Sequence, residues 1–205
     1  MQKIIEPQPI QIEFSKLYPE VVLASQSPNR RSLLEKGGTS VTARPQDTDE
    51  KLITDDHAEA IRINAERKLV SYMSSPDFDP DRVAISADTL ILVDGKLFGK
   101  QKTREDARKV LRLLSGNTQV CITGCGLYVP GYGTVTFADE AGVVFRTLTE
   151  EEIEDYLDTD EWIGAAGAYR FQKTGWKLTE RIDGDWTTVV GLPLQKLIDI
   201  AKSRM

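Results

Sequence analysis

The residues with the clearest chemical potential follow a short apolar run near the N-terminus. Residues 25–31 read Ser-Gln-Ser-Pro-Asn-Arg-Arg. A proline suits the first position of a helix, where its missing N–H costs nothing, and Ser27 would then cap the helix. The free N–H groups of that helix start, with Arg30 and Arg31 beside them, could hold an anion such as a phosphate group. The alternative is an ordinary capped helix with solvated arginines.

A carboxylate follows a second apolar segment. Residues 83–87 predict a buried strand, and we expect this strand to end at Asp88 and Thr89. Ligand sites in α/β proteins gather at the carboxyl ends of strands. A carboxylate in that position can hold a divalent cation, orient a water molecule or take its proton. An aspartate that forms a turn or caps a helix fits the pattern equally well.

Two lysines and an acidic loop complete the set of candidates. Lys100 follows a glycine, which lets the backbone approach a ligand. Lys68 falls at the edge of the apolar stripe of an expected helix, where a lysine usually extends to solvent. The acidic cluster Asp47, Asp49 and Glu50 could bind a hard cation through oxygen ligands, although such clusters are more often polar loops.

Composition narrows the classes of partner. The chain has 205 residues and a net charge of −6, which argues against nucleic-acid binding because that needs a basic footprint. No apolar run reaches about 18 residues, so we expect no membrane span, and the N-terminus does not resemble a signal peptide. The cysteines, Cys121 and Cys125, are four residues apart in an expected strand, too far apart for a disulfide. They predict reduced thiols in a cytoplasmic protein.

Alternating helices and strands must position these side chains. The hydrophobic patterning predicts an α/β protein with a mixed twisted sheet and flanking helices. The expected strands are 21–24, 83–87 with its continuation 90–93, 96–98, 119–129, 134–146, 177–182 and 187–190. The expected helices are 28–36, one from about 56, one capped by Thr103, one opened by a capping box at Thr149, and one opened by Pro193. We expect most basic residues after Thr103 and the acidic segment 149–161 to face solvent.

Several segments, taken in order, resemble the motifs of the Maf family of septum-formation-like nucleotide pyrophosphatases. They are Leu-Ala-Ser-Gln-Ser-Pro-x-Arg-Arg at 23–31, Ala-Asp-Thr at 87–89, Gly-Lys at 99–100 with the stripe and Ser-Gly at 107–116, Ala-Gly-Ala-Tyr at 166–169, and Val-Val-Gly-Leu-Pro-Leu at 189–194. The resemblance implies two lobes around a cleft, in a fold related to that of inosine-triphosphate pyrophosphatases. We therefore expect an N-terminal extension over residues 1–18 and one Maf-like nucleotide pyrophosphatase domain over residues 19–205.

The resemblance also implies a reaction. It implies hydrolysis of dTTP, UTP or a modified pyrimidine nucleotide to the monophosphate and pyrophosphate, with Mg²⁺ or Mn²⁺ as cofactor. Asp88 would be the proton acceptor, and Glu50 and Asp88 would bind the metal. The substrate-binding residues, including those of the helix start, would be Ser25, Ser27, Arg30, Arg31, Lys68 and Lys100. The residues that select the substrate would be Asn29, Thr89 and Gln172, of which Asn29 replaces the family's usual arginine.

Two other functions remain open from the sequence. A nucleotidyltransferase also begins with a strand, a phosphate-binding loop and an arginine, but it needs an acceptor and usually a glycine-rich loop. A non-catalytic module that binds nucleotides and regulates cell division would bind dTTP or UTP without turnover. The partner expected in each case is a small nucleoside triphosphate, with no nucleic acid and no membrane. The resemblance also allows a homodimer.

Overall fold

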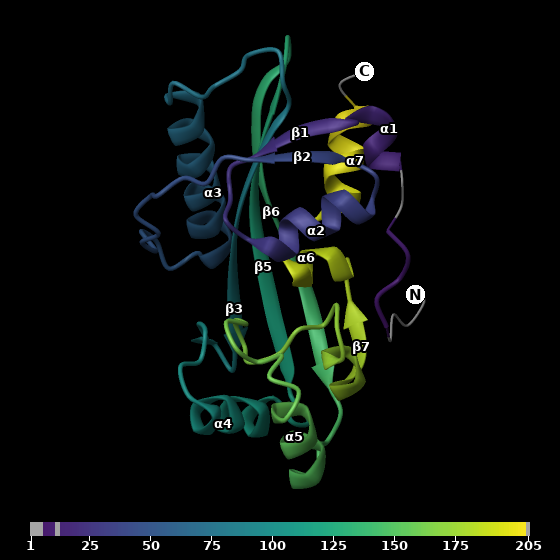
Figure 1. Cartoon of the computed structure of the whole chain (residues 1–205). Coiled ribbons are helices and arrows are strands. Elements are labelled where there is room, and N and C mark those ends of the chain that lie inside the picture. The colour runs from purple at the N-terminus through teal and green to yellow at the C-terminus, as the bar shows by residue number, and fades with distance from the viewer. Residues whose placement is uncertain (1–5, 11–12, 204–205) are drawn as a thin grey trace. The chain divides into compact units, whose positions relative to one another are not determined.

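The structure is a computed structural model that describes residues 6–10 and 13–203 (Figure 1). The strands are β1 (Glu20–Leu23), β2 (Ser40–Ala43), β3 (Ala84–Val93), β4 (Lys96–Leu97), β5 (Thr118–Val129), β6 (Gly133–Phe145) and β7 (Thr179–Asp183). The helices are α1 (Glu13–Leu17), α2 (Pro28–Lys36), α3 (His57–Met73), α4 (Arg104–Leu114), α5 (Glu150–Leu157), the 3₁₀ helix η1 (Gly175–Leu178), α6 (Trp186–Val190) and α7 (Leu194–Lys202).

The strands form one mixed sheet. Their order is β2-β1-β3-β5-β6-β7, and β4 pairs with β3 outside that path. β1 pairs in parallel with β2 and β3, whereas the β3–β4 and β6–β7 pairs are antiparallel. The prediction of an α/β protein with a mixed sheet and flanking helices is confirmed.

The chain separates into two compact units. Unit 1 contains Leu90–Cys121 and Glu140–Val190, and unit 2 contains Pro9–Thr89, Ile122–Asp139 and the chain from Gly191 onward. β3, β5 and β6 contribute residues to both units. Two compact units agree with the two lobes that the resemblance implies. The cleft between them, the N-terminal extension and the single domain stay predictions.

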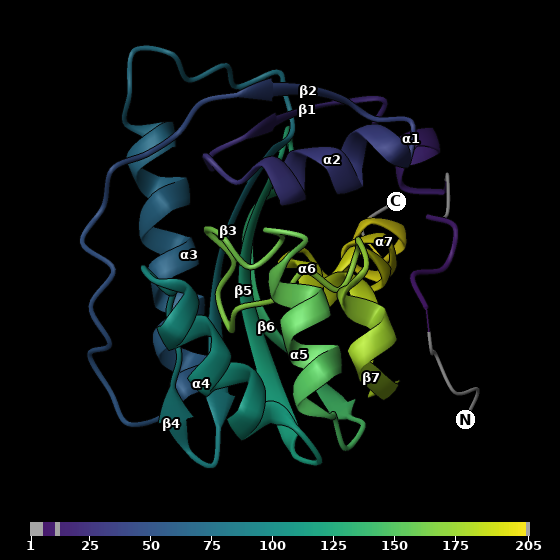
Figure 2. The same ribbon diagram turned by 60° about the horizontal axis from the view of Figure 1, so that its bottom comes forward.

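Unit 2 is built on the parallel strands β1 and β2. β1 buries three consecutive apolar residues, and its pairing with both neighbours ends at Leu23. α2 begins as predicted, with Pro28 at its first position and Ser27 as the N-cap. α2 packs along β2, and α1 lies beside α7 (Figures 1 and 2). The bend between β1 and α2 is therefore held by regular structure on both sides.

Helix α3 packs directly against the sheet. Asp56 caps it by accepting a hydrogen bond from the Glu59 N–H. Gly124 in β5 allows this close approach, because a Cβ there would stand 2.2 Å from the backbone oxygen of Ile61. This contact sets the distance between α3 and the sheet. It therefore also sets the positions of the α3 side chains that face the sheet.

Strand β3 lacks the interruption that the sequence suggested. Strand structure was expected at 83–87 and again at 90–93, with a stop at Asp88 and Thr89, and the stop is wrong because β3 runs without a break from Ala84 to Val93. The strand beside it stops earlier: Leu23 of β1 pairs with Ile85, the last paired residue between the two strands. Asp88 therefore lies past the carboxyl end of β1 while its own strand continues.

The expected strand 187–190 is also wrong, because these residues belong to α6. Asp185 explains the difference. Its carboxylate accepts hydrogen bonds from the backbone N–H and the hydroxyl of Thr187, at 2.8 and 2.7 Å. This local capping overrides the strand preference of the β-branched run Thr-Thr-Val-Val. The neighbouring strand begins at Thr179, because η1 occupies the residues before it.

The prediction that the two cysteines form no disulfide with each other is confirmed. Cys121 and Cys125 lie in β5 as free, buried thiols, and burial raises the pKa of each to about 12. Neither thiol is a nucleophile at neutral pH. None of the described helices is long and apolar enough to cross a membrane.

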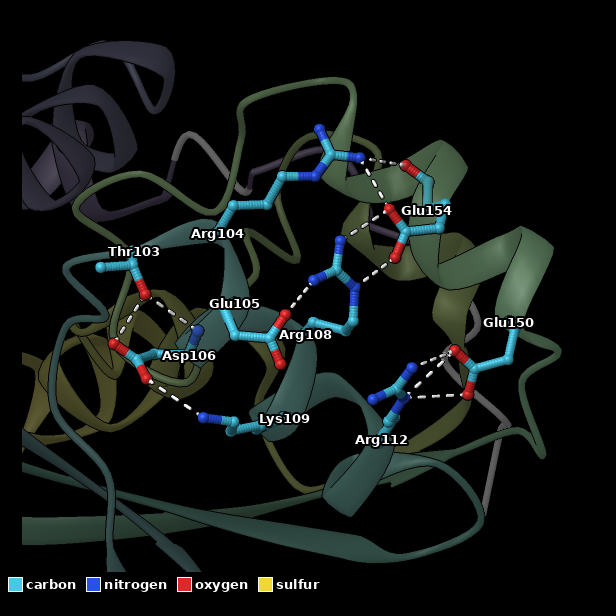
Figure 3. Close-up of polar contacts among 9 residues, drawn as sticks. All are labelled: Thr103, Arg104, Glu105, Asp106, Arg108, Lys109, Arg112, Glu150 and Glu154. Atoms are coloured by element: carbon cyan, nitrogen blue, oxygen red, sulfur yellow. Dashed lines mark hydrogen bonds and ion pairs between the residues drawn. The ribbon is translucent and has the colours of Figure 1, made fainter.

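Helices α4 and α5 of unit 1 are joined by ion pairs (Figure 3). Arg104 and Arg108 both reach Glu154, and Arg112 forms a two-pronged pair with Glu150. The two arginines that meet at Glu154 lower its pKa to about 2. Most of these charged side chains are exposed, as expected for a solvated face, and only Arg108 is largely covered. What the sequence did not indicate is that the two charged faces pair with each other.

We expect this network to make stability depend on pH. The Glu154 carboxyl has a folded-state pKa of about 2, below its value of about 4.3 in an unfolded chain. Its stabilising contribution is therefore complete above pH of about 4.3 and is lost as the pH falls toward about 2. Glu154→Gln should lower the thermal midpoint at pH 7, and the difference from wild type should shrink between about pH 5 and pH 3. Calorimetry at several pH values measures the thermal midpoints of the wild type and the variant.

Glu151→Gln is the matched control, because Glu151 is an exposed acid on the same helix. Salt at about 1 M should also reduce the difference in thermal midpoint between wild type and Glu154→Gln, since exposed ion pairs are screened. A difference in thermal midpoint that stays constant between about pH 5 and pH 3 would contradict the pairing of Glu154 with Arg104 and Arg108.

Candidate functional site

The candidate site in unit 2 lies where β1 ends and β3 continues. Ala24 N–H donates to the Ile85 backbone oxygen, and past this bond the chain after β1 bends through Ser25 toward α2. Asp88 stands three residues further along β3, with a side chain that is 13% exposed. The carboxylate is thus placed at the carboxyl end of the parallel part of the sheet, where ligands gather in α/β proteins.

Helix α3 supplies the partners of this carboxylate. Lys68 Nζ lies 2.9 Å from Asp88 Oδ1, and Asn64 Nδ2 donates to Asp88 Oδ2 at 3.2 Å. Lys68 and Asn64 are four residues apart, so they share one face of the helix. Both side chains are buried. The expectation that Lys68 extends to solvent is wrong, because the partly buried Asp88 carboxylate holds its ammonium group inside.

Glu50 joins this group from the loop between β2 and α3. Its Oε1 lies 2.6 Å from Lys68 Nζ, while its side chain is 56% exposed. Lys68 thus bridges two carboxylates, Asp88 at 13% exposure and Glu50 at 56%. The other acids of the predicted cluster lie outside this group: Asp49 pairs with Lys51 instead, and Asp47 is exposed.

These two carboxylates are the residues that could hold a metal ion. No group of three or more His, Cys, Asp or Glu side chains gathers among the described residues. A pair of carboxylates nevertheless suits Mg²⁺, which keeps several waters and is commonly bound through one or two carboxylates and the phosphates of its substrate. The donor set of Glu50 and Asp88 therefore fits a cation that arrives with a nucleotide.

Arg30 lies inside the protein and connects three segments of unit 2. Its Nε donates to the Gly191 backbone oxygen at 2.8 Å, Nη1 to Ser25 Oγ at 2.9 Å and Nη2 to Thr89 Oγ1 at 2.9 Å. Burial lowers the pKa of Arg30, while the negative charge of Asp88 opposes that change. A guanidinium keeps its proton all the same. Three of its five N–H groups are thus already bound by the protein.

The other predicted residues of the helix start have different surroundings. Ser27 Oγ accepts from the Arg30 N–H at 3.4 Å, as an N-cap does. Arg31 is exposed and pairs with Glu35 one turn along α2, at 2.7 Å. Asn29 is half-buried at the first turn of the same helix. The structure thus brings Ser25 and Arg30 into the buried network and leaves Arg31 on the helix surface.

Thr89 takes part in the network around Arg30. Its hydroxyl lies 3.0 Å from the hydroxyl of Thr123 in β5, and it also accepts from Arg30. Gly191 has a φ of +105°, and a Cβ there would stand 3.1 Å from Thr89 Oγ1. The close packing at this turn therefore requires a glycine.

Two predicted residues lie in unit 1. Lys100 is exposed, and its backbone forms an isolated bridge with Ala166. The Gly167 N–H donates to the Gly99 oxygen beside that bridge. The Gly-Lys and Ala-Gly-Ala-Tyr segments, far apart in the sequence, thus meet. Gln172 is partly buried in the same unit. A contact of Lys100 or Gln172 with the Asp88 group stays a prediction.

Sequence reasoning missed Asn64, Thr123 and Gly191. Asn64 carried a usable signal, because it lies four residues before Lys68 on a helix face that is otherwise apolar. Gly191 was visible only as part of a motif, with no indication that its carbonyl binds Arg30. Thr123 offered no local signal, since a threonine in a strand is ordinary.

We expect Arg30 to stabilise the fold strongly. Arg30→Met would remove the donor from the buried Gly191 oxygen and Ser25 hydroxyl and from the half-buried Thr89 hydroxyl, so the free energy of unfolding should fall by about 2–4 kcal/mol. Arg31→Met is the matched control on the same helix, and it should change stability by less than about 0.5 kcal/mol because its ion pair is exposed. Urea unfolding of both variants measures this. Equal losses from the two would contradict the structural role of Arg30.

Comparison with known proteins gives a consistent result. Relatives named dTTP/UTP pyrophosphatase come from Bacillus pumilus (35% identical, covering 90% of this chain and 96% of the relative), Geobacillus sp. (37%, covering 87% and 95%) and Pyrococcus furiosus (36%, covering 88% and 93%). Among solved structures, a nucleoside-triphosphatase described as a dITP/XTP pyrophosphatase, from Mycobacterium abscessus, covers 69% of this chain and 94% of its own. It is 13% identical with a TM-score of 0.37, which is too low to support a conclusion.

The family assignment follows from the sequence match that spans both units. Residues 20–204 match the family described as Maf-like protein. The matched range begins at the first residue of β1 and extends past the end of α7, so it includes the Ser-x-Ser-Pro bend, β3 and the Gly191 turn. This chain therefore belongs to the Maf-like protein family.

Proposed function

We propose that this protein hydrolyses dTTP and UTP to the nucleoside monophosphate and pyrophosphate. The observation that carries the proposal is the partly buried Asp88 carboxylate, held by Lys68 just past the end of β1. The names of the relatives support this reaction, because those proteins are called dTTP/UTP pyrophosphatases. A modified pyrimidine nucleotide belongs to the same substrate class.

Asp88 directs a water molecule onto the α-phosphorus of the nucleotide. The water oxygen forms a bond to this phosphorus while its proton passes to the Asp88 carboxylate. The bond between the α-phosphorus and the bridging oxygen breaks, and pyrophosphate leaves with that electron pair. Lys68 and Asn64 hold the two carboxylate oxygens and so set the direction from which the water is delivered.

The triphosphate is bound by cations and by the start of α2. Lys68 contributes its ammonium group, and Lys100 of unit 1 is the second proposed lysine. The start of α2 contributes the positive end of its dipole and the Asn29 N–H, because Pro28 has no N–H and the Arg30 and Arg31 N–H groups already donate to Ser27. Ser25 shapes the bend before that helix by accepting hydrogen bonds from the Ser27 N–H and Arg30. Arg30 acts on the substrate through its charge and its two remaining N–H groups.

Glu50 and Asp88 would hold the divalent cation, Mg²⁺ or Mn²⁺. When bound, that ion would supply positive charge to offset the charge that builds up on the leaving pyrophosphate. Asn29, Thr89 and Gln172 would set the preference for the base. In this role residues 19–205 would act as one domain, preceded by the extension. A homodimer and a cytoplasmic location remain predictions.

We expect the purified protein to release pyrophosphate from dTTP and UTP without any acceptor. Asp88→Asn should lower kcat by at least about 10²-fold, because the amide cannot take a proton from water. Binding of a non-hydrolysable dTTP analogue should persist, since the shape of the side chain is preserved. A coupled pyrophosphate assay and calorimetry measure the two quantities.

The same assay separates the other functions. A nucleotidyltransferase would release pyrophosphate only after an acceptor is added, and a non-catalytic regulator would bind nucleotide without turnover. Full activity of Asp88→Asn would exclude the role assigned to this carboxylate.

We expect removal of divalent cations to stop the reaction. EDTA should abolish turnover, and added Mg²⁺ or Mn²⁺ should restore it. Glu50→Gln should raise the Mg²⁺ concentration needed for half-maximal rate by about tenfold, because one carboxylate is lost from the donor set. Asp55→Asn, an exposed acid on the same loop, is the control and should leave the requirement unchanged. An unchanged requirement in Glu50→Gln would remove Glu50 from the metal site.

A further inference from the structure

Asn64 is a polar side chain in an unusual place. It lies on the buried face of α3, is 1% exposed, and has the apolar residues Ile61 and Ala65 as neighbours on the helix. Burying an amide costs free energy unless its hydrogen bonds are made. A leucine would fill a similar volume without that cost. The amide therefore needs an explanation in the contacts that it makes.

Its donor side has a clear target. Nδ2 donates to Asp88 Oδ2 at 3.2 Å, and Lys68 Nζ lies 2.9 Å from the other oxygen, Oδ1. Both partners come from one rigid helix, one turn apart, and Gly124 allows that helix to lie against the sheet. The carboxylate is thus held at both oxygens, so its plane cannot rotate freely about the Cβ–Cγ bond.

Its acceptor side has no partner among the described residues. Asn64 Oδ1 is buried and unpaired, although the large majority of buried polar atoms have a partner in the protein or an ordered water. The donation of Nδ2 to a carboxylate fixes which end of the amide is nitrogen, since a carboxylate cannot donate. The oxygen therefore lies next to the Asp88 contact and is available to an O–H donor.

We propose that Asn64 is a positioning residue for the Asp88 reaction. Its N–H fixes Asp88 Oδ2, and its amide oxygen accepts a hydrogen bond from the water molecule that Asp88 directs. Together with Lys68 it sets the angle at which this water meets the phosphorus. This inference rests on the proposed pyrophosphatase activity and adds a residue to it. Misplacement of a reacting group by about 1 Å can cost about 10²-fold in rate.

The test compares two substitutions with different chemistry. Asn64→Leu removes both the donor and the acceptor at nearly constant volume, and Asn64→Asp keeps the shape and an oxygen but loses the donor. We expect kcat for dTTP to fall by about tenfold to a hundredfold in both variants, with KM within about threefold of wild type. Binding of a non-hydrolysable dTTP analogue, measured by calorimetry, should be retained. Circular dichroism and thermal unfolding show whether each variant is folded.

Tyr72→Phe is the matched control. Tyr72 is buried on the same helix face, two turns after Asn64, and its hydroxyl bonds to the loop at Asp77 and Asp79. Its loss should leave kcat unchanged.

The outcomes are distinct. An active wild type whose Asn64→Leu and Asn64→Asp variants keep kcat within about threefold overturns the positioning role alone. A tenfold rise in KM with unchanged kcat also overturns it, because Asn64 would then serve binding. A wild type that releases no pyrophosphate overturns the proposed function itself.

Discussion

A carboxylate placed inside a fold must be offset by a cation or by hydrogen bonds, and this constraint organises unit 2 around Asp88. Lys68 meets the need from α3, at the cost of burying its own ammonium group. That arrangement works only if α3 lies close to the sheet, which the small residue Gly124 allows. The positions of α3, β3 and Gly124 are therefore all needed to form the Lys68–Asp88 ion pair.

The alternation of side chains along β3 divides the site into two parts. Successive residues of a strand point to opposite faces, and the contacts follow that rule. Asp88 contacts Asn64 and Lys68 of α3, whereas Thr89 contacts Arg30 of α2. One face thus holds the Asp88 carboxylate, while the other fixes the bend before α2. Because β1 ends before Asp88, the contacts of Asp88 with α3 and of Thr89 with α2 can both form along β3.

Local patterns in the sequence were sufficient where the physical cause is local. The start of α2 at Pro28 was predicted correctly because the cap and the first-turn proline lie next to each other. The capping box at Thr149 was predicted for the same reason. The helix at 186–190 was mistaken for a strand because the β-branched run outweighed Asp185, whose capping contacts lie just before it.

Properties that depend on distant partners could not be predicted in this way. Lys68 was expected in solvent because its two acids lie 18 and 20 positions away in the sequence, on a loop and a strand. Arg108 was expected to be solvated because its partner Glu154 is 46 residues further on. The resemblance to a family named the acid and the lysine, but it carried no geometry. Asn64 appeared only when α3 was placed over β3.

The charges of unit 2 limit how the proposed reaction can proceed. Arg30 and Lys68 bring two positive charges, and Asp88 and Glu50 bring two negative charges, so this group is neutral as a whole. A nucleoside triphosphate carries about four negative charges, and a neutral group cannot offset them by Coulomb attraction alone. In the proposed reaction the additional positive charge would come from a divalent cation held by Glu50 and Asp88. Such a cation would serve the binding of the phosphate tail as well as the departure of pyrophosphate, so the cation and the nucleotide would bind together.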